Sequence, residues 1–324
     1  MRHLRYVLSR LLQVVPVAFF IILVNFFLLR LAPGDLADVM AGEAGAATPE
    51  FVAALRQQFG SDQPVFTQLV HYYERVLSFD LGYSFRNSAA VLDLILARLP
   101  ATVLLVGTSL AVAALLGVAL GWFSAVTRKR WAGRLASVVS TIGFATPLFW
   151  VGLMLIVLFS IELKWLPTGG IVDLDADYEG WAYLLDVFKH MAMPVMSLAI
   201  FYIAIYARLT QVAVQDVLRL DYVRTARAKG LPASRVSRMH VLRNALLPVL
   251  TVTGMQVGSL IGGSVVVETV FAWPGMGRLA FDAVMQRDLN LLLGILFCTS
   301  LLVIAANLVT DLLYAALDPR IELT

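Results

Sequence analysis

The stretch from Asp221 to Pro248, DYVRTARAKGLPASRVSRMHVLRNALLP, is a strongly basic insert between two apolar segments. Neighbouring membrane spans are usually joined by short turns, whereas this insert is about as long as a helical hairpin. Its lysine and arginine side chains can contact anionic lipid headgroups, which is worth about 1 kcal/mol per cation. The chemistry that the insert offers is therefore recognition of charge, not bond making.

Local signals divide the insert into two short helices. Residues Tyr222 to Lys229 are compatible with a helix, Gly230 follows where a left-handed C-cap would lie, and Pro232 prevents continuation. Ser234 to Asn244 can form the second helix, and Pro248 suits the first turn of the next span. These helix stops are superfluous for lipid binding. A short helix held rigidly at a membrane surface can instead pass force to a partner, which indicates a transport subunit.

Residues that make or break covalent bonds are not grouped in any familiar pattern. The sequence contains no HExxH, CxxC, GxSxG or GxxxxGK[ST] motif. The four histidines lack metal-ligand spacing, and the single cysteine, Cys298, lies in an apolar run and has no intrachain disulfide partner. We therefore expect neither an enzyme nor a metal site, and no cofactor on this chain.

The elements that position the insert are membrane helices. Of the 324 residues, 60% are hydrophobic and 15% are charged, and the mean hydropathy is +0.81. Soluble domains carry about 25% charged and about 45–50% apolar residues. The pI is about 9.1, but the net charge is only +3. The distribution of the charged residues along the chain argues against nucleic acid as a partner.

Six segments approach the ~20 residues that cross ~30 Å of hydrocarbon. They are approximately Leu11–Leu31, 101–125, 135–161, 191–209, 249–271 and 291–314. The first could be a signal peptide, but its apolar core exceeds the usual length of about 7–15 residues, so we expect a retained span. Most of the 25 basic residues fall in short segments on the N-terminal side of the membrane, which predicts that both termini are cytoplasmic.

Polar residues inside spans are candidates for a translocation path, because leaving them in lipid is costly. These candidates are Asn25, Tyr202, Tyr206, Gln256 and Asn307. Asp311 and Glu268 lie near span ends, where we expect them to reach the interface. Glycines four apart, Gly117 and Gly121 in one span and Gly254, Gly258 and Gly262 in another, predict close packing of helices, within the chain or against a partner.

Residues 32–99 form a segment too long for a turn, with helical character. Thr48-Pro49 is a plausible helix start before Phe51, Leu55 and Phe59, and a second amphipathic run extends from Pro64 to Val76. Asn87 or Ser88 can cap a third helix that reaches Leu99, before Pro100 opens the second span. The segment is either a helical cap on the membrane or a docking surface.

The insert resembles the cytoplasmic "EAA" loop of binding-protein-dependent ABC importer permeases, in the form of the dipeptide/oligopeptide/nickel branch. Further motifs of that branch occur in order: Gly34-Asp35, Asp80-Leu81-Gly82-Tyr83-Ser84, Arg98-Leu99-Pro100-Ala101-Thr102, Leu166-Pro167-Thr168-Gly169-Gly170, FAWPGMGRL at Phe271–Leu279, and Asp318-Pro319-Arg320. The likeness covers nearly the whole chain and points to the B-type permease. Where the family has Glu-Ala-Ala the chain has Arg224-Thr225-Ala226, so only Ala226 and the later Gly230 match the motif. The closing Leu-Pro is displaced to Leu247-Pro248.

The resemblance implies an all-α polytopic membrane protein of six transmembrane helices with the type I ABC importer permease fold and a helical extracytoplasmic segment after the first span. It implies a cytoplasmic N-terminus and first helix at 1–31, an extracytoplasmic segment at 32–99, a transport core at 100–316 containing a coupling loop at 212–247, and a cytoplasmic tail at 317–324. The location implied is the prokaryotic cytoplasmic (inner) membrane.

The resemblance also implies partners and a role for the insert. A homologous second permease, two cytoplasmic ATPases and an extracytoplasmic substrate-binding protein are expected, together with membrane lipid, and ATP and Mg bind the ATPases. The residues expected to couple to an ATPase are Asp221, Tyr222, Val223, Arg224, Thr225, Ala226, Arg227, Ala228, Lys229 and Gly230. Arg224, Arg227 and Lys229 would pair with acidic groups of the ATPase groove, while Tyr222, Val223 and Ala226 pack into it.

Two other classes compete with an ABC permease. A self-contained, ion-coupled secondary transporter needs an intramembrane ion site and usually inverted repeats, and the halves of this chain show no convincing repeat. A membrane-embedded enzyme needs a catalytic constellation. Among ABC substrates, peptides are favoured over nickel complexes, glutathione and sugars because peptides dominate the resembling branch.

Overall fold

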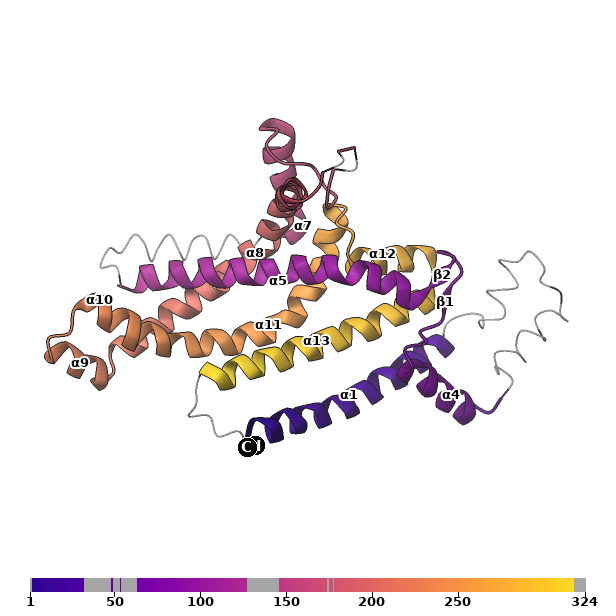
Figure 1. Cartoon of the computed structure of the whole chain (residues 1–324), viewed down its shortest axis with the longest axis horizontal. Helices are drawn as coiled ribbons and strands as arrows, with labels where there is room; N and C mark the ends of the chain where they lie inside the picture. The colour runs from indigo at the N-terminus through magenta and orange to yellow at the C-terminus, as the bar shows by residue number, and fades with distance from the viewer. Residues whose placement is uncertain are drawn as a thin grey trace. The chain divides into compact units, whose positions relative to one another are not determined.

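The computed structural model describes residues 2–31, 48, 53, 63–126, 146–173, 175–176 and 178–317. The chain forms two compact units, the first made of Met1–Arg98 with Leu279–Ile304 and the second of Leu99–Arg278 with Ala305–Leu323. The described part is helical apart from one short hairpin and the loops (Figure 1). Its elements are α1 (Arg2–Leu31), α4 (Val65–Leu77), β1 (Tyr83–Ser84), β2 (Ala89–Ala90), α5 (Val91–Val126), α7 (Leu148–Leu155), η1 (Ile156–Glu162), α8 (Trp181–Leu218), α9 (Asp221–Ala228), α10 (Ala233–Arg235), η2 (Val236–Leu242), α11 (Arg243–Val270), α12 (Met276–Gln286) and α13 (Leu289–Leu317).

The first unit is built around the packing of α1, α4 and the first half of α13. Ile22, Val76 and Phe297 form its buried apolar cluster. The amide of Asn25 donates to the carbonyl of Leu293 at 3.3 Å, so this polar side chain is satisfied inside the unit. Strands β1 and β2 pair antiparallel, and the hydroxyl of Ser84 donates to the carboxylate of Asp288.

The second unit is built on α8, which packs against both α11 and α7 (Figure 1). The predicted close approach at Gly117 and Gly121 is confirmed: a Cβ on Gly117 would lie 2.5 Å from Cβ of Tyr206, and one on Gly121 would collide with the carbonyl of Ala207. The second stripe is mixed. A Cβ on Gly254 would lie 2.5 Å from Cγ2 of Thr310, whereas one on Gly262 would meet nothing within 4 Å.

Four described helices are long and apolar enough to cross a membrane: Val91–Val126, Trp181–Leu218, Ala233–Val270 and Leu289–Thr310. Two further apolar stretches, Val15–Leu31 and Leu148–Glu162, are shorter. Each overlaps one of the six predicted spans. The prediction for 135–145 lies outside the described residues, so the structure supports a polytopic helical protein without confirming the count of six.

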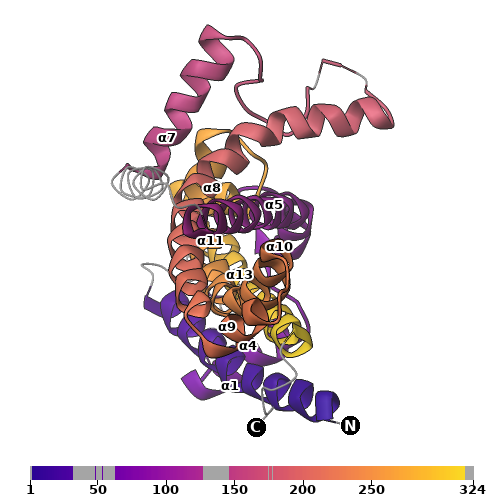
Figure 2. The same cartoon turned by 90° about the vertical axis from the view of Figure 1, so that its left-hand side faces the viewer.

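Two prolines that the sequence predicted to open helices, Pro100 and Pro248, lie inside longer helices. Pro100 is internal to α5, Pro194 to α8 and Pro248 to α11. The predictions that Pro100 and Pro248 begin spans are therefore wrong. Backbone groups in an apolar medium must stay hydrogen-bonded, so a helix continues through a proline and bends instead of stopping. Figure 2 shows α8 changing direction along its length in this way.

The segment between the first two predicted spans departs from expectation in part. The run Pro64 to Val76 is confirmed as α4. The third helix is wrong as a separate element, because α5 starts at Val91 directly after β2 and continues through Leu99. The predicted helix at Thr48 to Phe59 lies almost wholly outside the described residues.

Candidate functional site

The basic insert folds as a short helix followed by a sharp reversal. Helix α9 covers Asp221–Ala228, so it begins and ends one residue before the predicted Tyr222 to Lys229, and Lys229 is its C-terminal cap residue. Gly230 has φ +76°, which confirms the left-handed residue expected after the helix. Asp221 in the first turn and Arg227 in the last turn both complement the helix dipole.

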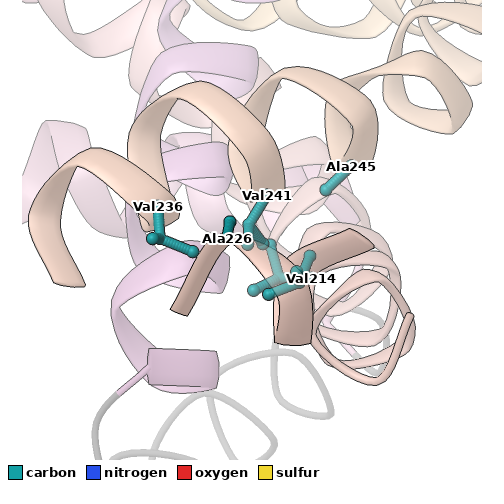
Figure 3. Close-up of a cluster of buried hydrophobic side chains, with 6 residues drawn as sticks. Val214, Ala226, Val236, Val241 and Ala245 are labelled. Carbon is teal, nitrogen blue, oxygen red and sulfur yellow. The ribbon is translucent and has the colours of Figure 1, made fainter. Parts of the chain in front are cut away.

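One face of α9 is buried against its own chain. Val223 is fully buried and Ala226 is 7% exposed, and both belong to a cluster with Val214 of α8, Val236 and Val241 of η2, and Ala245 of α11. Figure 3 shows Ala226 and the labelled side chains of α8, η2 and α11 meeting between the helices. Val223 and Ala226 had been expected to pack into an ATPase groove. Their burial here gives them a different role, which is to attach α9 to α8, η2 and α11.

Hydrogen bonds near the two ends of η2 also hold this region together: those of Tyr222 join α9 to η2 and α11, and that of Trp122 joins α5 to η2. The hydroxyl of Tyr222 donates to the carbonyl of His240 at 3.2 Å, and the amide of Asn244 donates to the Tyr222 oxygen at 2.7 Å. The indole nitrogen of Trp122 donates to the hydroxyl of Ser237 at 3.1 Å. The contacts of Tyr222 thereby tie α9 by side chains to the start of α11.

The other face of α9 is exposed and mainly cationic. Asp221, Arg224, Thr225, Arg227, Ala228, Lys229 and Gly230 are all exposed. Arg224 and Asp221 approach to 3.4 Å, with side chains 73% and 95% exposed. An ion pair this exposed contributes about 0–1 kcal/mol, so it does not keep Arg224 from an anionic partner. The helix therefore presents cations outward on an apolar base.

The predicted path residues are not gathered into one site. Tyr202 and Tyr206 are both buried on α8, whereas Gln256 is half-buried on α11 and Asn307 is exposed on α13. Asn25 lies in the other unit, where it bonds to Leu293. Tyr202 lines a cavity within the described part of the chain.

That cavity lies between α7, α8 and α11 and has a volume of about 210 Å³. Its walls include Leu148 and Val151 of α7, Ser197 and Tyr202 of α8, and Gly263 of α11. The hydroxyl of Ser197 is buried and has no hydrogen-bond partner among the described residues. Sequence reasoning missed Ser197 and Gly263, because a serine and a glycine within apolar runs carry no local signal of a cavity.

Glu268 is a buried carboxylate, and the expectation that it reaches the interface is wrong. It is 0% exposed and accepts hydrogen bonds from the Thr102 hydroxyl at 2.8 Å and from the Arg278 backbone N–H at 2.9 Å. Thr102 in turn accepts from the backbone N–H of Met276 at 2.7 Å. The carboxylate therefore links α5 and α11 to the first turn of α12, where the positive end of the helix dipole favours it.

A buried tryptophan completes this linkage. The Trp273 indole nitrogen donates to the carbonyl of Ala101 at 2.9 Å, and the Trp273 backbone N–H donates to the carbonyl of Glu268 at 2.8 Å. A Cβ added to Gly275 would collide with the Glu268 carboxylate, so the carboxylate packs directly on that glycine. The FAWPGMGRL stretch thus holds the end of α11 and the start of α12 against α5 through buried hydrogen bonds. Across the described residues, no three His, Cys, Asp or Glu side chains are placed to hold a metal ion.

Comparisons with known proteins agree over the whole chain. Residues 117–323 match the family described as binding-protein-dependent transport system inner membrane component, and residues 3–106 match the N-terminal family of such membrane components. The chain is 41% identical over 320 residues to the glutathione transport system permease protein GsiC of Escherichia coli O6:H1 (strain CFT073) and to that of Escherichia coli (strain K12), covering 98% of this chain and 99% of each relative. In fold it is similar to a solved structure of the MetNI methionine ABC transporter in inward facing conformations, with a TM-score of 0.56 and 16% identity over 69% of this chain and 96% of that one.

Proposed function

The chain belongs to the family of binding-protein-dependent transport system inner membrane components, and from that membership we propose that it is the peptide-translocating permease of an ATP-driven importer, driven through α9. The observation that carries the coupling role is the two-sided construction of α9. Its cationic face is exposed, and its apolar face is locked onto α8, η2 and α11.

The mechanism follows from that construction. An ATPase subunit binds the exposed face of α9, with its acidic groups opposite Arg224, Arg227 and Lys229. Closure of two ATPases around ATP displaces α9, and the buried contacts of Val223 and Ala226 carry the displacement into α8 and α11. Gly230 turns the chain sharply, so α9 stays separate from the following helix. A push on α9 therefore does not slide the two helices along a common axis.

The assembly needs further chains because this chain has no phosphate-binding loop. We infer a homologous second permease, two ATPases that bind ATP and Mg, and an extracytoplasmic binding protein that delivers substrate. Hydrolysis takes place on the ATPases. The positive-inside rule puts α9 and both termini in the cytoplasm.

Peptides are the substrate class that the relatives favour. The relatives at 41% identity are named as glutathione permeases, and glutathione is itself a peptide. A peptide combines charged ends with variable side chains, so its path needs both polar groups and apolar room. The cavity between α7, α8 and α11 supports this class, because apolar residues and the hydroxyl-bearing residues Thr146, Ser197 and Tyr202 line it.

Charge reversal on α9 tests the coupling role. Arg227→Glu should abolish ATP-dependent uptake in proteoliposomes that contain the whole transporter, because the exposed cation then repels an acidic groove. Arg238→Glu on η2 is the matched control, since Arg238 is also an exposed cation in the same insert. Equal loss in both variants would point to lipid contact instead of docking.

Purification from the native membrane gives a second, independent test. The tagged chain, extracted in mild detergent, should retain a homologous permease and ATPase subunits, and Arg227→Glu should lose the ATPases. Recovery of the chain alone, together with ion-driven uptake in liposomes without ATP, would overturn the proposal in favour of a secondary transporter.

A further inference from the structure

We propose that the first part of α8, residues 181–193, lies along the membrane–water interface and inserts an apolar stripe between phospholipid headgroups. A bilayer surrounds this protein, since the chain belongs to a family of inner membrane components. All the contacts that orient the segment lie inside the second unit. Neither the coupling role of α9 nor the side of the membrane on which this end of α8 lies is needed for the placement.

The length of α8 exceeds what a bilayer requires. Its 38 residues extend about 57 Å along a straight helix axis, whereas about 20 residues cross ~30 Å of hydrocarbon. Pro194 lies inside the helix, where a bend can occur, and Figure 2 shows α8 changing direction along its length. Residues 195–218 alone are long enough to cross. The first part of α8 is therefore not needed for the crossing and can lie at the surface of the bilayer.

An apolar stripe runs along the outer face of this first part. Trp181, Leu184, Leu185 and Phe188 follow the spacing i, i+3, i+4, i+7, which places them on one side of a helix. They are between 46% and 73% exposed, so the most apolar side of the segment points away from its own chain. A contiguous exposed face of this kind marks contact with a membrane or with another protein.

The opposite face of the segment is polar and is held against the chain. Asp186 and His190 are buried there, with Nδ1 of His190 2.9 Å from the backbone carbonyl oxygen of Asp186. The Asp186 carboxylate accepts the backbone N–H of Asp173 at 2.7 Å. The loop before Asp173 is bound to the end of α11, because the N–H of Gly170 donates to the carbonyl of Phe271 at 2.9 Å. These bonds fix the rotation of the helix, so the apolar stripe cannot turn inward onto its own chain.

The side-chain types around the stripe favour the headgroup layer over a protein partner. Trp181 and Tyr183 are exposed on the helix, and Trp165 and Tyr178 are exposed in the segment before it. Such rings are enriched at membrane–water interfaces, because one end is apolar and the other is polar. Lys189 is exposed one turn after Leu185, where its ammonium can reach phosphate groups while its stem stays on apolar surface. Since lysine is depleted at protein–protein interfaces, lipid is the occupant that fits both the rings and the cation.

The depth of nitroxide labels in the bilayer tests this placement. Leu184→Cys, Phe188→Cys and Ala182→Cys are each made in a Cys298→Ser chain, which removes its single cysteine. Each variant is purified with the subunits it retains and reconstituted in vesicles of phosphatidylethanolamine and phosphatidylglycerol. A Cys298→Ser sample without an introduced cysteine supplies the background from other subunits. Power saturation with oxygen and with a water-soluble nickel chelate measures depth. Ala182 is the control position, because it is exposed but lies about 200° around the helix from Leu184.

The labels at positions 184 and 188 should lie at one shared depth, about 5–10 Å into the boundary between headgroups and acyl chains, and the label at 182 should meet more of the chelate. A depth difference of about 6 Å between 184 and 188, the rise of four residues, would instead make this part a continuation of the span. Exclusion of both reagents from 184 and 188 would mean that a protein subunit covers the stripe, and free access of the chelate to all three labels would mean that water does. Each of these three results overturns the interfacial placement. Leu185→Cys replaces either stripe variant that fails to assemble.

Discussion

Removing two methyl groups from Val223 tests whether α9 works as a firmly attached lever. Val223 is fully buried in the cluster that joins α9 to α8, η2 and α11. Val223→Ala loses about 1.6 kcal/mol of transfer free energy, at about 0.8 kcal/mol per methyl group. The cavity that remains brings the cost to about 2–3 kcal/mol.

Most of that cost should appear as local detachment of α9. Only Val223 and Ala226 of this helix are buried, so little else holds it apart from the hydrogen bonds of Tyr222. A loss of about 2–3 kcal/mol raises the opening equilibrium by about 30- to 140-fold, at 1.4 kcal/mol per factor of ten. Backbone amides of residues 223–229 should exchange hydrogen faster by the same factor.

The assay combines hydrogen exchange of the assembled transporter with the number of peptides imported per ATP hydrolysed. Val223→Ala should accelerate exchange in α9 and lower the import ratio. Thr225→Ala is the control, because it trims a similar side chain on the exposed face of the same helix and should cost less than about 0.5 kcal/mol. Unchanged exchange would refute the packing argument, and fast exchange with an unchanged import ratio would refute the lever.

Three further outcomes follow from contacts in the two units. Glu268→Gln should destabilise the detergent-solubilised chain by about 1–3 kcal/mol, measured by thermal unfolding, because an amide cannot accept from all the surrounding donors. Gly121→Ala should cost about 1–3 kcal/mol through collision with α8, whereas Gly107→Ala, which meets nothing within 4 Å, should not destabilise. The Arg75 guanidinium, 2.8 Å from Asp80, holds the pKa of that carboxyl below its usual value. The ion pair should therefore stabilise the unmodified protein slightly above the ordinary aspartate pKa of about 3.9, and this stabilisation should be lost as pH falls below that value. The difference in unfolding free energy between the unmodified protein and Arg75→Gln, measured across that pH range, should shrink accordingly.

The sequence predicted the α9 region closely because its signals are local. Gly230 and Pro232 end a helix wherever they occur, and the run before them contains nothing that breaks one. The inward position of Val223 and Ala226 was missed, although their spacing of three residues puts them on one helical face. The resemblance had assigned that face to an ATPase, and only the packing in the structure assigned it to the chain itself.

The helix boundaries at prolines show the opposite case. Pro100 and Pro248 are strong stop or start signals in water, where a broken helix can bond to solvent. In an apolar surrounding no such replacement exists, so α5 and α11 run through them. The local rule for prolines gave the wrong helix boundaries because it holds for helices in water and these helices lie in an apolar surrounding.

By itself the sequence determined that this chain is a polytopic helical membrane protein with a rigid basic insert. Hydrocarbon as a solvent dictates long apolar runs and helical backbone, and both can be seen in the order of residues alone. Only the tertiary structure decided that Glu268 is buried against Thr102, 166 positions away, and that Ser197 and Gly263 border one cavity. Those sites depend on which helix faces meet. Helices in lipid associate through packing of small side chains and a few hydrogen bonds between residues that are distant in sequence. Such contacts leave no periodic pattern along the chain.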